Sequence, residues 1–372
     1  MNNLIVIGAG PKGLAIAAKN QILQELGIET PNVIVIEKSE IAAHWTGKSG
    51  YTNGQMTLGT SPEKDIGYPY DTQEFTSEIN QKVNSAMMQF SWMSYLIDTN
   101  LYSDYVDRGR PFPVHHEYAA YLLWVAEKLG KNTSFKFGMV KSLDLVNDNI
   151  IEVTYSTKLG DVSVIGNGIV FTGPGKSKVE YSKADSKRVL DIEKFWMNYK
   201  NIGFKSGDKI GIIGAGENAA SMAIALGDLE SKLDIEVITP AGAIFSRGES
   251  FFENQVYSDP VKGKWNKLTY ADKVNFIKRT DLGVFGVYAQ EQLNNRRDIQ
   301  VVPGRVQEIN EKATNVEVQL SYDTTAEVQK FDYIILASGF DQLKHPDYSP
   351  DLKDHLCANP ANYRESSPSA QA

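Results

Sequence analysis

One pattern occurs twice in the chain: a short apolar run, a Gly-x-Gly turn, and an Ala-rich stretch of helical character. The first copy covers residues 4–18 and the second covers 210–226. A buried strand that turns through Gly-x-Gly into a helix typically binds the pyrophosphate of a dinucleotide, because glycine lets the phosphates approach the backbone. Two copies in 372 residues predict an α/β fold with two Rossmann-like dinucleotide-binding domains.

The first turn follows an apolar run at 4–7 and consists of Gly8, Gly10, Pro11 and Gly13. Its first glycine permits a tight turn, its second lets a pyrophosphate approach, and its third lets the helix pack closely on the strand. A second apolar run, 33–36, ends in Glu37, at the distance where ribose hydroxyls need an acceptor. An acid there favours a free ribose 2′-OH, and so FAD or NAD over NADP.

The second turn consists of Gly214, Gly216, Glu217 and Asn218, with Ala219 in place of the third glycine. The next apolar run, 235–238, ends without an acid, so no carboxylate would repel a 2′-phosphate. Arg247 follows shortly afterwards, and its guanidinium suits bidentate pairing with that phosphate, although a solvated surface arginine is the alternative. We interpret the second site as one for NADPH.

Small residues follow an apolar strand on both sides of the second turn, at 169–173 and at 331–340. Such residues let the backbone come close to a flavin or a domain crossover, and Ser338, Gly339 and Phe340 are candidates for contact with the cofactor. Runs 150–155 and 162–170 predict strands of a small meander. The layout predicts an FAD domain at 1–200, an inserted NADPH domain at 201–338, and a return to the FAD domain with a tail at 339–372.

Composition excludes several classes of function. A net charge of −8 and a pI near 5.3 argue against a nucleic-acid partner. Cys357 is the only cysteine, so flavin chemistry through a redox-active disulfide is excluded. No apolar stretch approaches the roughly 20 residues of a membrane span, and a cytoplasmic location is the expectation. His44, His115 and His116 lack a third ligand at a sensible spacing, so no metal is expected.

With both turns placed, the chain resembles the flavin-dependent N-hydroxylating monooxygenases, the lysine and ornithine hydroxylases of siderophore biosynthesis. The resemblance covers residues 1–341. It is carried by the first turn at 8–13, His-Trp-Thr-Gly at 44–47, Met56 with Lys-Asp-Ile at 64–66, the aromatic stretch 112–124, Ser-Phe-Phe-Glu-Asn at 250–254, and Ala-Ser-Gly-Phe at 337–340.

The resemblance implies FAD at the first turn and NADPH at the second. In that family the reduced flavin traps O₂ as a C4a-hydroperoxide, and the distal oxygen passes to a primary amine of an amino acid such as ornithine or lysine. Lys64 would meet a substrate carboxylate and Asn254 would hydrogen-bond the substrate. Lys38, Trp45 and Met56 would contact the cofactor. Relatives often assemble, so a homo-oligomer is an open expectation.

The sequence departs from the family pattern at Asp281, which stands where an asparagine usually lies near the reacting amine. An acid there would hold a cationic amine protonated, which is the wrong state for a nucleophile, so Asp281 would bind another part of the substrate. Two alternatives stay open. One is a flavin monooxygenase acting on sulfur or ketones, whose Phe-x-Gly-x-x-x-His signature is not seen here. The other is a non-oxygenating, NADPH-dependent flavin reductase.

Overall fold

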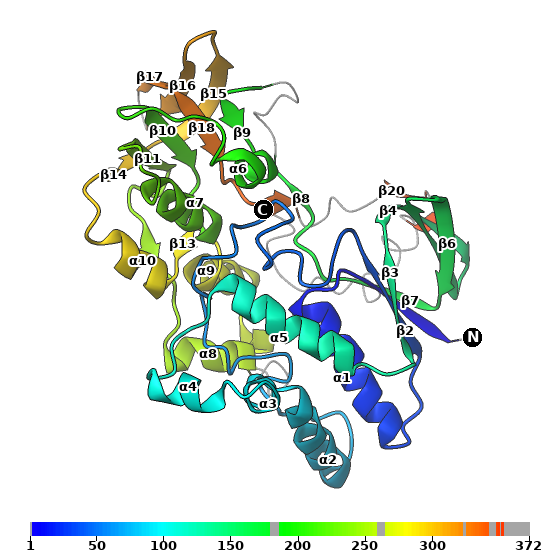
Figure 1. Ribbon diagram of the computed structural model, residues 1–372. Helices are drawn as coiled ribbons and strands as arrows, with labels where there is room; N and C mark the ends of the chain where they lie inside the picture. Colours follow the sequence, from blue (N-terminus) through cyan, green and yellow to red (C-terminus); the bar gives the residue numbers. More distant parts are fainter. Residues whose placement is uncertain are drawn as a thin grey trace. The chain divides into compact units, whose positions relative to one another are not determined.

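The computed structural model describes residues 2–178, 186–258, 265–322, 325–341, 347–349 and 351–352, and it divides into two compact units (Figure 1). The first unit contains residues 2–49, 60–174 and the described residues after 346. The second contains residues 50–59 and the described residues of 175–341. Cys357 and the end of the predicted tail lie outside the described residues.

The first unit is built on a parallel sheet with the strand order β3-β2-β1-β7. Its central strand pairs in register on both sides, so that Ile5 lies opposite Ile34 and Ile169. Continuous apolar runs suit such strands because both faces of the sheet are covered. The strands are β1 (Asn3–Ile7), β2 (Asn32–Glu37), β3 (Thr133–Phe137) and β7 (Gly168–Phe171).

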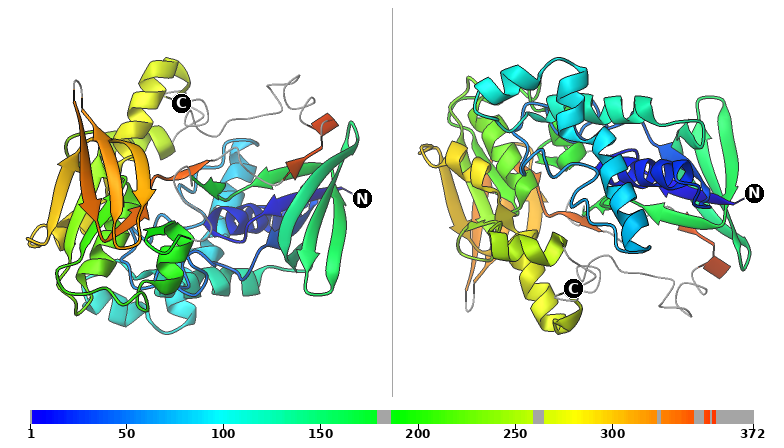
Figure 2. Two further views of the ribbon diagram at one scale, coloured as in Figure 1. Left: turned by 90° about the horizontal axis from the view of Figure 1, so that it is seen from above. Right: turned by 90° about the horizontal axis from the view of Figure 1, so that it is seen from below.

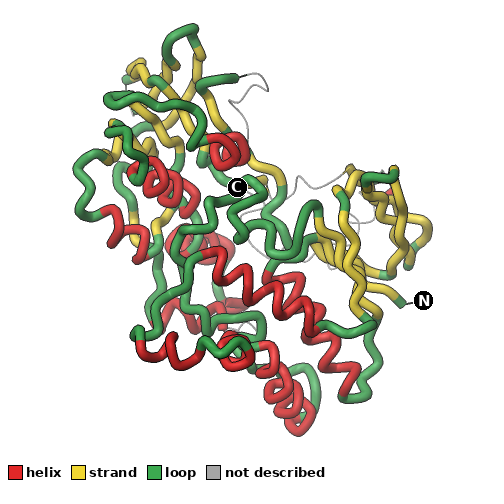
Figure 3. The backbone as a smooth tube through the Cα atoms, in the orientation of Figure 1, coloured by secondary structure: helices red, strands yellow, loops and turns green. Residues whose placement is uncertain are grey.

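Successive residues of β1 are buried on opposite faces of this sheet. Val6 packs with Ala17 of helix α1 (Pro11–Glu25), and Ile5 packs with Leu143 and Val153 of the antiparallel strands. Helices cover one face and the antiparallel sheet covers the other, as Figures 2 and 3 show. That sheet has the order β20-β4-β5-β6 and comprises β4 (Met139–Asn147), β5 (Ile150–Thr157), β6 (Gly160–Gly166) and β20 (Asp347–Tyr348).

A helical segment between β2 and β3 completes the first unit. It contains α2 (Ser77–Met87), η1 (Met88–Phe90), α3 (Trp92–Asp98), α4 (Tyr102–Asp107) and α5 (His115–Lys128). Tyr121 of α5 is fully buried, and its ring contacts Trp92 and Tyr95. Its hydroxyl donates to the Phe90 carbonyl at 2.8 Å and accepts from the Ile66 N–H at 3.4 Å, so one side chain ties three segments together.

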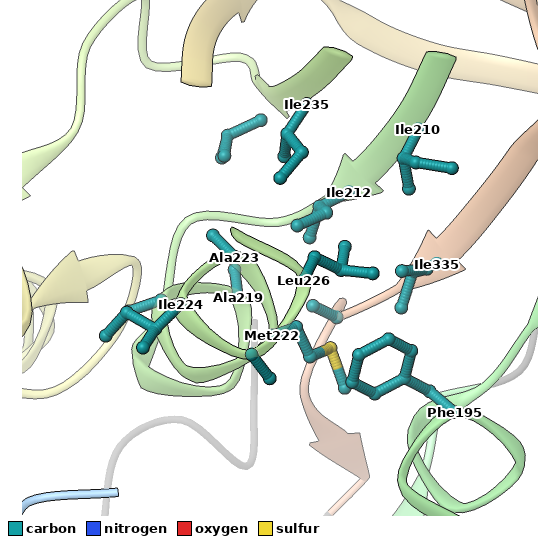
Figure 4. Close-up of a cluster of buried hydrophobic side chains, with 14 of the residues drawn as sticks. Phe195, Ile210, Ile212, Ala219, Met222, Ala223, Ile224, Leu226, Ile235 and Ile335 are labelled. Atoms are coloured by element: carbon teal, nitrogen blue, oxygen red, sulfur yellow. The ribbon is translucent and has the colours of Figure 1, made fainter. Parts of the chain in front are cut away.

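The second unit repeats the plan with a five-stranded parallel sheet in the order β14-β11-β10-β18-β9. Its strands are β9 (Val189–Leu190), β10 (Lys209–Ile213), β11 (Asp234–Thr239), β14 (Ile299–Pro303) and β18 (Tyr333–Leu336). On one face, Ile212 and Ile235 pack against Met222 of α7 (Glu217–Gly227), as Figure 4 shows. The α/β prediction with two Rossmann-like units is confirmed.

The opposite face of this sheet packs against a second antiparallel sheet, β15-β16-β17. Ile213 and Leu336 point to that side and lie in one apolar cluster with Val318 and Leu320. Both units therefore have three layers: helices, a parallel sheet and an antiparallel sheet. The strands of the third layer are β15 (Arg305–Glu311), β16 (Val316–Ser321) and β17 (Ala326–Phe331).

The remaining elements of the second unit connect these layers. They are β8 (Lys176–Ser177) paired with β19 (Phe340–Asp341), α6 (Ile192–Asn198), β12 (Phe245–Ser246) paired with β13 (Val284–Phe285), α8 (Phe251–Ser258), η2 (Trp265–Lys267), α9 (Tyr270–Thr280) and α10 (Val287–Leu293). Among the described helices, none is both long and apolar enough to pass through a membrane.

The division between the units differs from the expected boundary near Asn201. Strand β9 pairs with β18, and Phe195 of α6 is fully buried in the core beside α7, so residues 186–200 belong to the second unit. The expected strand at 162–170 is two strands in the structure. β6 ends at Gly166 and β7 begins at Gly168, because the chain passes there from the antiparallel sheet to the parallel one.

Replacing Tyr121 by phenylalanine tests its bridging role in the first unit. The change removes only the hydroxyl and leaves a buried carbonyl and a buried N–H unpaired. We expect the free energy of unfolding to fall by about 1–3 kcal/mol. Chemical denaturation measures this change. Tyr95→Phe is the matched control, because the Tyr95 hydroxyl does not bridge these groups. Equal losses for the two variants would contradict the assignment.

Candidate functional site

The first Gly-x-Gly turn has the geometry that its sequence predicts. Gly8 has φ +109°, and a Cβ atom there would lie 2.5 Å from Thr172 Oγ1, just after β7. A Cβ atom on Gly13 would lie 2.1 Å from the Gly8 carbonyl oxygen. Helix α1 starts with Pro11 and has no side-chain cap at Gly10. Its first N–H groups can therefore receive a phosphate, which the helix dipole also favours.

Glu37, the last residue of β2, lies against this turn. One carboxylate oxygen accepts from the Ala9 N–H at 2.9 Å, and the other accepts from the Ser39 N–H at 3.1 Å. These two bonds fix the carboxylate beside the turn, and each oxygen keeps acceptor capacity for a ribose hydroxyl. Lys38 is exposed next to it. The arrangement fits the adenosine half of FAD.

Trp45 lies in the same unit, between two histidines. Its ring centroid is 5.1 Å from that of His44, 4.7 Å from that of His115 and 5.4 Å from that of Tyr118. Burial, with a smaller effect from His44, lowers the pKa of His115 to about 3, and burial also lowers the pKa of His44. Both imidazoles are therefore neutral near pH 7, so the two histidines in contact with Trp45 carry no charge. No group of three metal-ligating residues occurs within the described part of the chain.

Lys64 lies in a turn whose next residue, Asp65, is buried and was not singled out by the sequence analysis. Asp65 accepts from the Trp92 N–H at 2.8 Å, the Tyr70 hydroxyl at 2.7 Å and the Gly67 N–H at 3.0 Å. Burial raises the pKa of Asp65, although these hydrogen bonds oppose the shift. Asp65 thus holds the loop that presents Lys64, whose Nζ is 5.9 Å from the Tyr68 ring centroid. The motif at 64–66 was the signal that could have pointed to it.

The second turn repeats the close approach seen at the first. Gly214 has φ +123°, and a Cβ atom there would lie 2.3 Å from the Ala337 carbonyl oxygen, just after β18. Helix α7 then begins at Glu217 with no side-chain cap at Gly216, and Asn218 follows in its first turn. The N–H groups at this end are thus available to a second pyrophosphate.

The predicted phosphate partner, Arg247, is already engaged with protein groups. Its Nε donates to the Thr280 carbonyl at 3.0 Å and lies 3.3 Å from a Glu249 oxygen. Burial raises the pKa of Glu217 and Arg247 lowers it, while Glu249 and Asp281, which follows α9, raise it further. Arg247, Glu217 and Asp281 therefore form one charged cluster beside the second turn. A role for Arg247 toward a 2′-phosphate stays a prediction that depends on its remaining nitrogens.

The other predicted residues are distributed over both units. Asn254 lies in α8 of the second unit, where its side chain donates to the Glu249 carbonyl at 2.9 Å, whereas Lys64 belongs to the first unit. Met56 is buried in the core that contains α7. At the end of β18, Ser338 donates to the Lys178 carbonyl at 3.1 Å, Gly339 has φ +87°, and Phe340 begins β19. Contacts of these residues with cofactor or substrate stay predictions.

Two alanine substitutions in the first turn separate folding from FAD binding. Gly13→Ala places a methyl group against the Gly8 carbonyl. We therefore expect this variant to lose about 1–3 kcal/mol of stability and to lose FAD binding as well. Gly10→Ala meets nothing within 4 Å, so the apoprotein should unfold at the wild-type temperature while FAD binds more weakly. Thermal unfolding of the apoprotein and flavin titration measure both effects. Wild-type FAD affinity in Gly10→Ala would show that this turn is not the FAD site.

Comparison with known proteins places the chain among flavin enzymes of this architecture. Residues 83–342 match the family model described as L-lysine 6-monooxygenase/L-ornithine 5-monooxygenase. The L-lysine N6-monooxygenase MbtG of Mycolicibacterium paratuberculosis is 36% identical over 349 residues, covering 92% of this chain and 78% of the relative. An L-ornithine N(5)-monooxygenase of Pseudomonas aeruginosa is 22% identical, covering 96% and 82% of the two chains.

A solved structure of the lysine monooxygenase NbtG from Nocardia farcinica is 35% identical and superposes with a TM-score of 0.81, covering 96% of this chain and 85% of that one. The ornithine hydroxylase PvdA of Pseudomonas aeruginosa is 20% identical with a TM-score of 0.70 over 93% and 83%, and supports the fold. The match to the family model and the extent of the 36% identity leave one conclusion: the chain belongs to the L-lysine 6-monooxygenase/L-ornithine 5-monooxygenase family, whose members are N-hydroxylating flavin enzymes that use FAD and NADPH.

Proposed function

We propose that this monooxygenase hydroxylates the side-chain nitrogen of L-lysine, with FAD at the turn of Gly8 and Gly10 and NADPH at the turn of Gly214 and Gly216. The observation that carries the choice of lysine is the contrast in identity: 36% to relatives named L-lysine N6-monooxygenase, against 22% to those named L-ornithine N(5)-monooxygenase. The sequence had left both amines open.

The reaction consumes one amine, O₂, NADPH and a proton, and yields a hydroxylamine, NADP⁺ and water. Bound FAD supplies the redox chemistry, by accepting a hydride and activating O₂ for transfer to nitrogen. The chain binds and orients the reactants. Its two uncapped helix ends suit the two pyrophosphates, and Glu37 suits the FAD ribose.

Lys64 is the proposed partner of the substrate carboxylate. Asp65 anchors its loop through three hydrogen bonds, two of them from backbone N–H groups, so the backbone that carries Lys64 is held in place. A fixed cation at one end of the substrate selects the side-chain amine at the other end by its distance. Asn254 stays a predicted hydrogen-bond partner of the substrate, and Asp281 stays a predicted contact of another part of it. A cytoplasmic location and assembly into a homo-oligomer stay predictions.

Coupled product formation tests the proposed substrate. FAD-loaded protein with NADPH and O₂ should convert L-lysine to its N6-hydroxy product with a higher kcat/KM than L-ornithine, as the higher identity to relatives named for lysine predicts. Product is measured by mass spectrometry, and NADPH oxidation and peroxide release are measured in parallel. A higher kcat/KM for ornithine would show that ornithine, and not lysine, is the substrate. Peroxide without hydroxylated product for every amine would indicate a non-oxygenating reductase.

Lys64→Met tests the carboxylate contact with a matched pair of substrates. The variant loses the cation and keeps most of the apolar stem. We expect KM for L-lysine to rise by about 10- to 100-fold, equivalent to the 1.5–3 kcal/mol of a charged hydrogen bond. KM for cadaverine, which has the same amines and no carboxylate, should change little. Steady-state kinetics measure both, and an equal rise for the two diamines would show that Lys64 acts on the fold or the cofactor.

A further inference from the structure

Glu217 is an unusual residue for the place that it occupies. It is the first residue of α7, directly after the second Gly-x-Gly turn, where a dinucleotide would bring two phosphate charges to the helix N-terminus. A carboxylate there repels the ligand that the helix end attracts. The conflict disappears if the carboxyl group is neutral when the ligand is bound.

The surroundings of Glu217 favour the neutral form by geometry. Its Oε1 atom is buried and has no hydrogen bond of good geometry within the described residues, although the Gly286 N–H lies near enough to the carboxyl group to lower its pKa. That oxygen lies against Gly286 at the start of α10, where an added Cβ atom would come within 2.9 Å of it. A cavity of about 30 Å³ adjoins the site and is lined by Met56, Thr57, Glu217, Ser221, Gly286 and Tyr288. A buried carboxylate oxygen without a donor is costly, whereas a carboxylic acid tolerates this setting.

The charges around Glu217 act in both directions. Burial, Glu249 and Asp281 raise its pKa, while Arg247 and the Gly286 N–H lower it. Arg247 is divided between the Thr280 carbonyl and Glu249, so it does not neutralise Glu217 alone. Glu249 and Asp281 add negative charge near Glu217, and Glu249 pairs with this same arginine. One more negative group at the turn would favour protonation of Glu217 further.

We propose that Glu217 is a proton-linked gate on the second nucleotide site: binding of NADP⁺ or NADPH places a proton on the Glu217 carboxyl group, and deprotonation of Glu217 weakens the binding. The proposal rests on the placement of NADPH at this turn, made above. It assigns to Glu217 a control of cofactor affinity by pH, because the phosphates and the ionised carboxylate compete for the same helix end.

The direction of the effect follows from linkage. A bound pyrophosphate raises the pKa of a neighbouring carboxyl group, so the complex holds more protons than the free protein between the two pKa values. Affinity is highest where Glu217 is protonated in both states, and it falls as pH rises through that interval. Each unit by which binding raises the pKa corresponds to about a tenfold loss of affinity.

Calorimetry of NADP⁺ binding to the FAD-loaded protein tests the gate directly. Titrations at one pH, in two buffers of different ionisation enthalpy, give the number of protons taken up. We expect net uptake in the wild type to exceed that in Glu217→Gln by up to about one proton. Titration of the 2′-phosphate of NADP⁺ is common to both proteins and cancels. Glu291→Gln on α10 is the control, because Glu291 is exposed and should leave the uptake at the wild-type value.

Two further measurements make the outcome decisive. As pH rises through the titration of Glu217, the wild-type Kd for NADP⁺ should rise by about tenfold or more relative to that of Glu217→Gln. The infrared difference spectrum on NADP⁺ binding to the wild type should show a new protonated-carboxyl band that is missing in the variant. Equal proton uptake and equal pH dependence in the two proteins would overturn the proton-linked role of Glu217 and leave the placement of NADPH intact. Failure of the FAD-loaded wild type to bind NADP⁺ would overturn the placement of NADPH as well.

Discussion

Both units depend on the same constraint, a close contact between the first glycine of a turn and the backbone or side chain just beyond a neighbouring strand. At Gly8 the neighbour is Thr172, and at Gly214 it is the Ala337 carbonyl. Neither position has room for a Cβ atom, and both have positive φ. Because the turn rests on the adjacent strand, the following helix is fixed over the sheet, and its N-terminus faces the edge where a dinucleotide binds. The three layers of each unit are arranged around this contact.

Local patterns were enough to predict the parts of the fold that depend on neighbours in sequence. The two turns, the strand ending in Glu37 and the small residues after β7 and β18 were each visible as short motifs. The break between β6 and β7 was not predicted, although Gly166-Asn167-Gly168 interrupts the apolar run at that point and was a local signal for it. The membership of residues 186–200 in the second unit also depends on pairing with β18, more than 130 residues away, which no local pattern reveals.

The candidate site divides in the same way into residues that local patterns predict and residues that they do not. Gly8, Gly13 and Gly214 follow from close backbone approaches that leave no room for a Cβ atom. The surroundings of Arg247 and Glu217 do not, because they come from α9 and the start of α10, which converge on the turn only in the folded unit. Asp65 is a similar case. Two of its donors, Gly67 and Tyr70, lie in its own loop, but the third is the Trp92 N–H at the start of α3, and that contact cannot be inferred from the turn that contains Asp65.

The pairing of β20 with β4 has a consequence for the order in which the chain is made. Asp347 pairs with Ser142, and everything from residue 175 to residue 341 lies between these partners in the sequence. During synthesis from the N-terminus, the ribosome releases residues 175–341 of the second unit before β20 of the first unit emerges. The antiparallel sheet of the first unit is therefore completed only after these residues are made, and until then the edge of β4 is left open to other strands.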